Sequence, residues 1–170
     1  MNWFCYTLLF LVLPDFLSSQ GRIFLSHPYG TGKDETRDLA IDDMNGDGHL
    51  DIVTANIGER NAIYYGNAKG TFVKFQTFGN ETDATYSIDL SDLDLDGDID
   101  IVVGNAGQRN HYLLNNGTEF KQYEFGPVEN VTYGVTIGDL DGDSYPDIIT
   151  ANSGSQNIIY LNQPAKNRDK

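Results

Sequence analysis

The chain has 170 residues, and its 11 basic and 25 acidic side chains give a formal net charge of −14 at pH 7. This acidic excess argues against nucleic acid or an anionic membrane surface as partner, because charges of the same sign repel. The apolar fraction of 39% and the aromatic fraction of 12% are enough for a packed core, which excludes a wholly disordered chain.

Residues 1–20 have the pattern of a signal peptide. Their apolar stretch from Trp3 to Leu13 is well short of the ~20 residues that span a bilayer, and small residues follow at Ser18 and Ser19. The sequence therefore predicts a secreted, extracellular protein with no membrane span after removal of the signal, and an uncleaved hydrophobic anchor is the alternative. Removal would also take away Cys5, the single cysteine.

Residues 21–162 contain three copies of one unit. Acidic motifs start at Asp43, Asp92 and Asp139, which lie 49 and 47 residues apart, a period typical of propellers and other repeat architectures. Other positions recur in the same register on both sides of each motif: Thr36, Thr85 and Thr132; Asn56, Asn105 and Asn152; Arg60, Arg109 and Gln156; Asn61, Asn110 and Asn157. The matched register indicates a genuine repeat. Residues 163–170 form a polar tail.

Each copy is expected to form four short strands. The first strands alternate apolar and polar residues around Leu39, Ile88 and Val135, the period of a half-buried strand. Unbroken apolar runs follow each acidic loop and predict second strands covered on both faces, at 52–55, 101–104 and 148–151. Third strands are expected at 62–65, 111–114 and 158–161, and fourth strands at 72–78 and 120–125.

The last copy has no fourth strand after Leu161, and residues 23–29 stand in the register of the fourth strands. The sequence therefore predicts an all-β fold of β-propeller blades, each of four antiparallel strands, with the last blade completed by a strand from each end of the chain.

The three acidic loops, 43–51, 92–100 and 139–147, are predicted calcium sites. Oxygen-bearing side chains fall at positions 1, 3, 5 and 9, and so many carboxylates in one loop repel one another unless a cation neutralises them. Position 7 would contribute its backbone carbonyl. Glycine permits the sharp bend at position 6 in the first two loops. Ser144 replaces it in the third loop, whose site we expect to be strained or weaker. The candidate ligands are Asp43, Asn45, Asp47, His49 and Asp51; Asp92, Asp94, Asp96, Asp98 and Asp100; and Asp139, Asp141, Asp143, Tyr145 and Asp147.

Two other interpretations of these loops exist. An EF-hand shares the opening of the motif but requires a bidentate Glu at position 12, where this chain has Thr54, Val103 and Thr150. That interpretation is rejected. Acidic turns that simply stay solvated would explain one loop more easily than three in matched register.

The motif Asp-x-Asp/Asn-x-Asp-Gly-x-x-Asp, followed by an apolar pair and then Ala/Gly-Asn, resembles the FG-GAP/VCBS repeats of integrin-α-like β-propellers. The resemblance covers residues 23–162. It implies propeller blades with about one Ca²⁺ per repeat, held in the hairpin between the first and second strands. The chain departs from the family pattern after the second strand, where Thr-Ala-Asn or Val-Gly-Asn replaces Gly-Ala-Pro.

Three blades are fewer than the four to eight that close a ring. Three arrangements remain open: a fragment of a longer propeller, a homo-oligomer that completes the ring (for instance six blades from two chains), and a small open array capped by residues 23–29. We expect self-association or a fragment rather than a stable monomer, because an open array exposes two edges.

No arrangement of nucleophile and base suggests catalysis, and His27, His49 and His111 stand in unlike contexts. We therefore expect binding or adhesion to an extracellular protein or glycan, not enzymatic activity. Alternatives are a calcium-dependent lectin, for which Tyr86 and Tyr133 could stack on sugars, and a non-catalytic fragment of a polysaccharide-acting enzyme. Glycosylation sequons occur at Asn80, Asn116 and Asn130.

Overall fold

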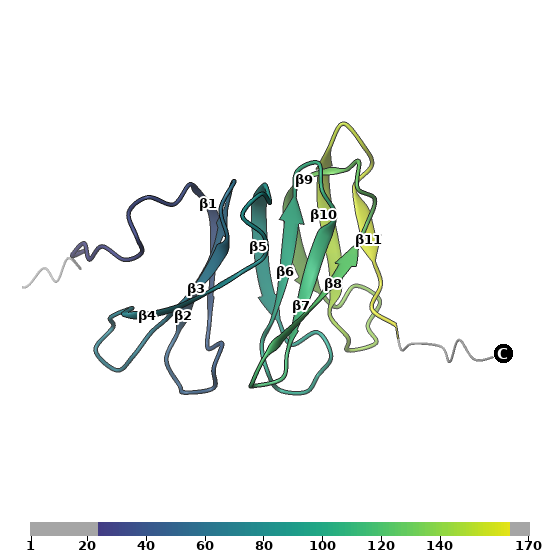
Figure 1. Cartoon of the computed structure of the whole chain (residues 1–170). Coiled ribbons are helices and arrows are strands. Elements are labelled where there is room, and N and C mark those ends of the chain that lie inside the picture. Colours follow the sequence, from purple (N-terminus) through teal and green to yellow (C-terminus); the bar gives the residue numbers. More distant parts are fainter. Residues whose placement is uncertain (1–23, 164–170) are drawn as a thin grey trace, which may run out of the picture.

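The structure, a computed structural model, describes residues 24–163 and is built of strands alone (Figure 1). The first sheet contains β1 (Thr36–Asp42), β2 (Asp51–Asn56), β3 (Asn61–Tyr65) and β4 (Lys74–Phe78). The second contains β5 (Thr85–Ser91), β6 (Asp100–Asn105), β7 (Asn110–Asn115) and β8 (Phe120–Phe125). The third contains β9 (Val131–Gly138), β10 (Asp147–Ser153) and β11 (Ile158–Tyr160). No helix in this part of the chain is long and apolar enough to cross a membrane.

The three sheets are antiparallel, and their strands follow chain order. The sheets stand side by side in one row, with β5 next to both β1 and β9 (Figure 1). This confirms an all-β array of repeated sheets, with four, four and three strands. The described residues form no closed propeller.

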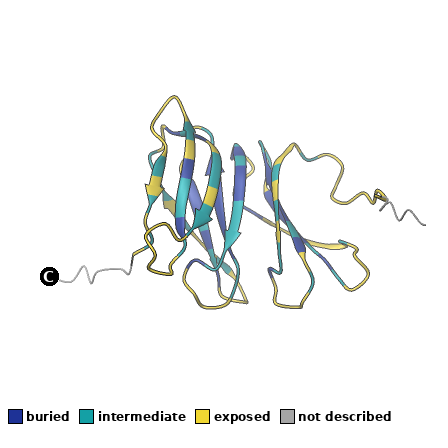
Figure 2. Cartoon of the chain, turned by 180° about the vertical axis from the view of Figure 1, so that it is seen from behind, coloured by how far each residue is buried: buried dark blue, intermediate teal, exposed yellow. Residues whose placement is uncertain are grey.

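The main core lies between the first two sheets. Val53, Ala55 and Ile63 of the first sheet pack against Ile101 and Val103 of the second, and all five are at most 1% exposed. Every residue of the central strand β6 is buried, whereas only Asp147 and Thr150 are buried in β10 and its other residues are half-buried or exposed (Figure 2). The expectation of second strands covered on both faces therefore holds for the middle sheet and, except at Ile52, for the first. It is wrong for the third sheet, where Ala151 is exposed and Ile148 and Ile149 are only half-buried.

The predicted closure by the N-terminal segment is also wrong within this chain. Residues 24–29 form no strand, and the segment lies beside the first sheet, at the opposite end of the row from β11 (Figure 1). The ring of Tyr29 contacts Tyr64 and Phe72, with centroid distances of 5.5 and 6.0 Å. The register was recognised correctly, but register alone does not say which sheet the segment joins. The predicted signal peptide and all of the polar tail but Gln163 lie outside the described residues.

A chain of side-chain hydrogen bonds, here called the Thr–Asn ladder, connects the three sheets. Within each sheet a Thr hydroxyl donates to an Asn side-chain oxygen, and the backbone N–H of that Asn donates to a second Asn. The amide of that second Asn reaches the Thr of the next sheet, with bonds of 3.1 Å and 3.0 Å at the two junctions. The ladder comprises Thr36, Asn56, Asn61, Thr85, Asn105, Asn110, Thr132, Asn152 and Asn157. It accounts for the recurrence of these residues in the sequence.

Candidate functional site

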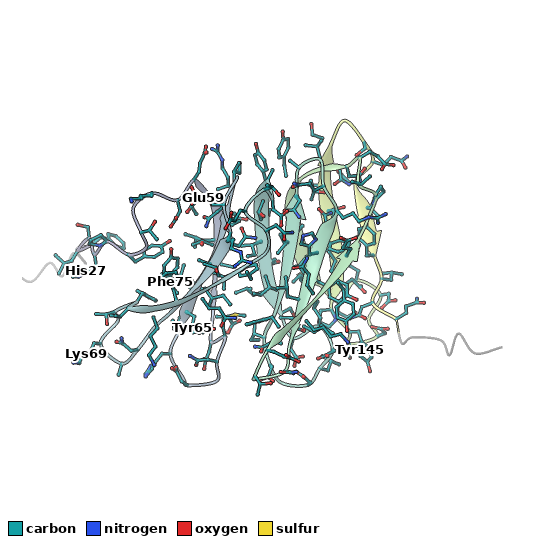
Figure 3. The ribbon with its side chains drawn as sticks, in the orientation of Figure 1. His27, Glu59, Tyr65, Lys69, Phe75 and Tyr145 are labelled. Carbon is teal, nitrogen blue, oxygen red and sulfur yellow. The ribbon has the colours of Figure 1, made fainter. Side chains whose placement is uncertain are left out.

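The three acidic loops connect the first and second strands of their sheets. Each loop begins where one strand ends and closes on the buried first residue of the next, Asp51, Asp100 or Asp147, each 0% exposed. Figure 3 places Tyr145, in the third loop, and Glu59, in the turn before β3, at opposite edges of the array. The acidic loops and the Thr–Asn ladder therefore lie at opposite ends of the strands.

The position-1 carboxylate organises each loop through backbone hydrogen bonds. In the first loop Asp43 accepts from the N–H groups of Asp47 and Gly48 at 3.1 and 2.7 Å. Asp92 accepts from Asp96 and Gly97 at 3.0 and 2.9 Å. Asp139 accepts from Gly142 and Ser144 at 2.8 and 3.0 Å. These bonds fold the loop back on itself and bring its oxygen atoms toward one another.

The position-9 carboxylate joins the loop to the sheet. Both oxygens of Asp100 accept backbone N–H groups, from Leu93 and Asn115, at 2.7 Å each. Asp51 and Asp147 make the corresponding pairs of bonds in their own sheets. Burial raises the pKa of Asp100 to about 6, although these two N–H donors oppose the rise. A nearby cation would offset this cost of burying the charge.

In the second and third loops, three carboxylates bring oxygen atoms within 4.8 Å of one another. The residues are Asp92, Asp94 and Asp100 in one loop and Asp139, Asp141 and Asp147 in the other. Partial desolvation raises the pKa of Asp94, and repulsion by Asp96 raises it further. Hard oxygen donors in this arrangement fit Ca²⁺, and either acidic cluster could hold a metal ion.

The first loop repeats the position-1 hydrogen bonds of the second loop, with one carboxylate fewer. Asn45 stands at position 3, and its side-chain oxygen accepts from the N–H of Asp47 at 2.9 Å. At position 5, Asp47, Asp96 and Asp143 each accept the N–H of position 7, that of His49, Asp98 or Tyr145, at 2.9 Å. The predicted use of the position-7 carbonyl oxygen as a ligand stays a prediction.

Left-handed backbone at positions 4 and 6 is a shared feature of the loops. Glycine occupies four of the six positions, and the exceptions are Leu95 and Ser144, with φ values of 62° and 76°. The strain predicted for Ser144 is confirmed in its backbone geometry, whereas Leu95 was missed. Leu95 could have been identified from the sequence, because position 4 is glycine in the other two copies, Gly46 and Gly142.

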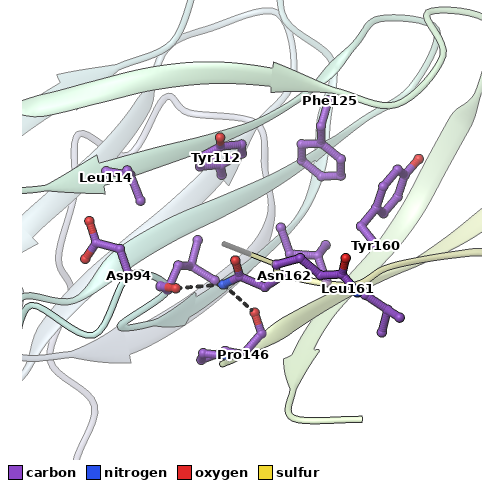
Figure 4. A pocket seen from close by; sticks show the side chains of 11 residues that line it. Asp94, Tyr112, Leu114, Phe125, Pro146, Tyr160, Leu161 and Asn162 are labelled. Atoms are coloured by element: carbon purple, nitrogen blue, oxygen red, sulfur yellow. Dashed lines mark hydrogen bonds between the residues drawn. The ribbon is translucent and has the colours of Figure 1, made fainter. Parts of the chain in front are cut away.

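Two asparagines that were not expected from the sequence connect neighbouring loops. The side-chain amide of Asn115 donates to the carbonyl of Met44 in the preceding loop at 3.0 Å. Asn162 donates to the carbonyl of Leu93 at 2.7 Å, a bond made from one sheet to the loop of the one before (Figure 4). Both asparagines occupy the same register position in their repeats, at the last residue of β7 and shortly after β11, and this recurrence could have identified them.

The sequons differ in accessibility. Asn80 and Asn116 are exposed, and Asn116 lies in the turn between β7 and β8. Asn130 is 5% exposed, and its side-chain nitrogen, the atom that would carry a glycan, is buried without a hydrogen-bond partner. The folded chain therefore disfavours a glycan at Asn130.

Comparison with known families gave one match. A family model described as FG-GAP-like repeat matches residues 43–103 and again 92–150, so the two matches together cover more than half of the chain. Each match begins at one acidic loop and ends in the strand that follows the next acidic loop, β6 for the first match and β10 for the second. A search of curated proteins found no match.

Proposed function

The chain belongs to the FG-GAP-like repeat family, and on that premise we propose that it is a secreted protein that binds Ca²⁺ through its three acidic loops. Its role is extracellular binding or adhesion, with no catalytic step of its own. The observation that carries the calcium assignment is the convergence of three carboxylates in each of two equivalent loops, within 4.8 Å.

The chain's own residues explain why an ion would bind at these places. Hydrogen bonds to position 1 shape the loop in advance, so little ordering is needed when an ion enters. The carboxylates at positions 1, 3 and 9 supply hard oxygen ligands, and Ca²⁺ would supply the positive charge that relieves their repulsion. In the first loop the Asn45 amide oxygen takes the place of one carboxylate.

Equilibrium dialysis tests the calcium assignment. Protein stripped with a chelator is dialysed against about 1 mM Ca²⁺, and bound metal is measured by elemental analysis. We expect up to three ions per chain, with Mg²⁺ binding more weakly because it demands a smaller octahedral site. Absence of bound Ca²⁺ would contradict the proposal.

Glycan binding is a second candidate, favoured by a pair of aromatic side chains. The rings of Tyr86 and Tyr133 meet with a centroid distance of 4.7 Å, and Arg37 lies over Tyr86 at 5.9 Å. The Tyr133 side chain is 51% exposed, so it is not part of the packed core. An exposed aromatic face of this kind can stack on a sugar ring. A glycan array with wild-type chain and the Tyr133→Ala variant, each with and without calcium, separates this function from protein adhesion.

A further inference from the structure

Both ends of the row expose apolar residues whose equivalents are buried at the junction between the first two sheets and half-buried at the next junction. Leu39 of β1 is 51% exposed, whereas Ile88, at the same position in the second sheet, is 5% exposed. At the other end Ile159 of β11 is 57% exposed, and the equivalent Ile63 is 0% exposed. The acidic loops show the same difference, since Leu140 is 51% exposed and its equivalents Met44 and Leu93 are at most 5% exposed. Each end therefore presents one half of an inter-sheet junction.

The Thr–Asn ladder is open at the same two ends. Thr85 and Thr132 are 0% exposed and accept from the amide of an Asn in the preceding sheet, whereas Thr36 is exposed. Asn157 is also exposed, although its equivalents Asn61 and Asn110 are each 2% exposed. An Asn157 amide of one chain and a Thr36 hydroxyl of another are the two partners that an additional rung requires.

Residues 24–29, which precede β1, make the same kind of contact with the first sheet that the end of β8 makes with the third sheet. The ring of Tyr29 meets Tyr64 edge-on, with a centroid distance of 5.5 Å and an interplanar angle of 80°. Phe125, the last residue of β8, meets Tyr160 in the same way, at 5.0 Å and 83°. Residues 24–29 thus stand in the register of β8, beside the first sheet, with no strand to pair with. Phe24 is 100% exposed.

The third sheet offers the matching vacancy. It has no fourth strand within the described residues, and a cavity of about 300 Å³ lies between it and the second sheet (Figure 4). The cavity is lined by residues that include Leu93, Ile148 and Tyr160. The equivalents of these three at the preceding junction are Met44, Ile101 and Leu113, and they belong to the core cluster against which Phe120 packs. Phe24 is the register equivalent of Phe120.

We propose that a second copy of this chain docks on the third sheet and supplies residues 24–29 as its fourth strand, beside β11. Phe24 of the second copy enters the cavity, and its Leu39 face covers Ile159. The pairing of β7 with β8 sets the register, which places His27 of the second copy opposite Ile159. The two such contacts of a dimer give six sheets, within the four to eight of closed propellers.

The occupant is a second copy because the segment and β11 of one chain lie at opposite ends of the row (Figure 1). A polar contact supports the same choice. Arg60 and Arg109 donate to the carbonyls of Gly79 and Gly126, which follow the fourth strands of their own sheets, at 3.2 and 2.9 Å. Gln156 is their equivalent in the third sheet, and Gly30 of the second copy offers the corresponding carbonyl. Assembly of this kind does not require a bound metal ion.

Sedimentation of the wild-type chain over a range of concentrations tests the assembly. We expect a species of twice the single-chain mass, and Phe24→Ser should raise its dissociation constant by at least about tenfold, because the phenyl group no longer fills the cavity. The melting temperature of the single chain should not change, since Phe24 is fully exposed there. Val128→Ser is the matched control, an exposed apolar side chain in the turn after β8, and should leave the constant unchanged. A single-chain mass at every concentration, or no effect of Phe24→Ser, would overturn the proposal.

Cysteine cross-linking tests the register independently. One chain carries His27→Cys and another carries Ile159→Cys, both with Cys5→Ser, so that only links between chains can form. Directly opposed positions on antiparallel strands come close enough for a disulfide. Oxidation of the mixture should give the mixed dimer, whereas His27→Cys mixed with Val128→Cys should not. A mixed dimer in both mixtures, or in neither, would show that the segment does not pair with β11.

Discussion

The side-chain amide of Asn110 donates to the hydroxyl of Thr132 at 3.0 Å, across the junction between the second and third sheets. The same bond joins Asn61 to Thr85 at 3.1 Å at the preceding junction. Both pairs are almost completely buried, so water cannot replace a lost partner. The Thr–Asn ladder is therefore a stabilising connection between sheets as well as a repeated sequence pattern.

Replacing Thr85 by valine should destabilise the chain by about 2–4 kcal/mol. The shape is kept, but Asn61 loses its acceptor and Asn105 loses its donor in a buried place. Urea denaturation measures the change. Thr118→Val is the control, because Thr118 bonds to Asn116 in an exposed turn and should change stability by no more than about 0.5 kcal/mol. Equal effects of the two variants would show that burial of the ladder does not matter.

Removing calcium should lower the melting temperature. Extracellular modules bind Ca²⁺ with Kd of about 10⁻⁴–10⁻³ M, so three sites at about 1 mM calcium contribute roughly 1–4 kcal/mol. For a chain of this size that corresponds to several degrees. Calorimetry with and without EDTA measures the shift, and re-addition of Ca²⁺ should reverse it. An unchanged melt would count against the calcium sites.

Substitution of Asp94 by alanine should reduce the number of bound Ca²⁺ ions by one near 1 mM, because position 3 then offers no oxygen. Asp94→Asn should bind with an intermediate affinity, since it gives the second loop the donor that Asn45 gives the first. Elemental analysis after dialysis counts the ions. Glu81→Ala removes an exposed carboxylate outside the loops and should keep the wild-type count. An unaltered count in Asp94→Ala would exclude this residue as a ligand.

Ser144→Gly and Leu95→Gly should each stabilise the calcium-free chain by about 0.5–1 kcal/mol. Each side chain stands in left-handed backbone that glycine adopts without steric cost. Gly97→Ala is the reverse test, because an added Cβ there meets no atom within 4 Å and only the backbone conformation, with φ of 97°, opposes it. It should destabilise by a similar amount. Thermal melts in EDTA compare the three variants, and a destabilised Ser144→Gly would show that the hydroxyl matters more than the strain.

The repeat register predicted much of the fold because each copy repeats the same strand, loop and turn. The acidic loops and the buried second strand of the middle sheet followed from residue types at fixed positions. The connections between copies did not, since spacing along the chain does not reveal that Asn61 faces Thr85 or that Asn115 reaches Met44. The closure by residues 23–29 failed for the same reason. A segment can have the register of a strand while the sheet that would receive it lies far away or in another molecule.

Because the acidic loops lie at the opposite edge of the array from the Thr–Asn ladder, negative charge is concentrated at one edge. Each ion that enters a loop adds two positive charges to one rim and leaves the opposite rim unaltered. A partner attached at the loop rim should therefore bind with an affinity that follows calcium and ionic strength together, because its neighbouring field changes with every ion gained. A partner held at the other rim, about the length of a strand away, would be largely indifferent to both.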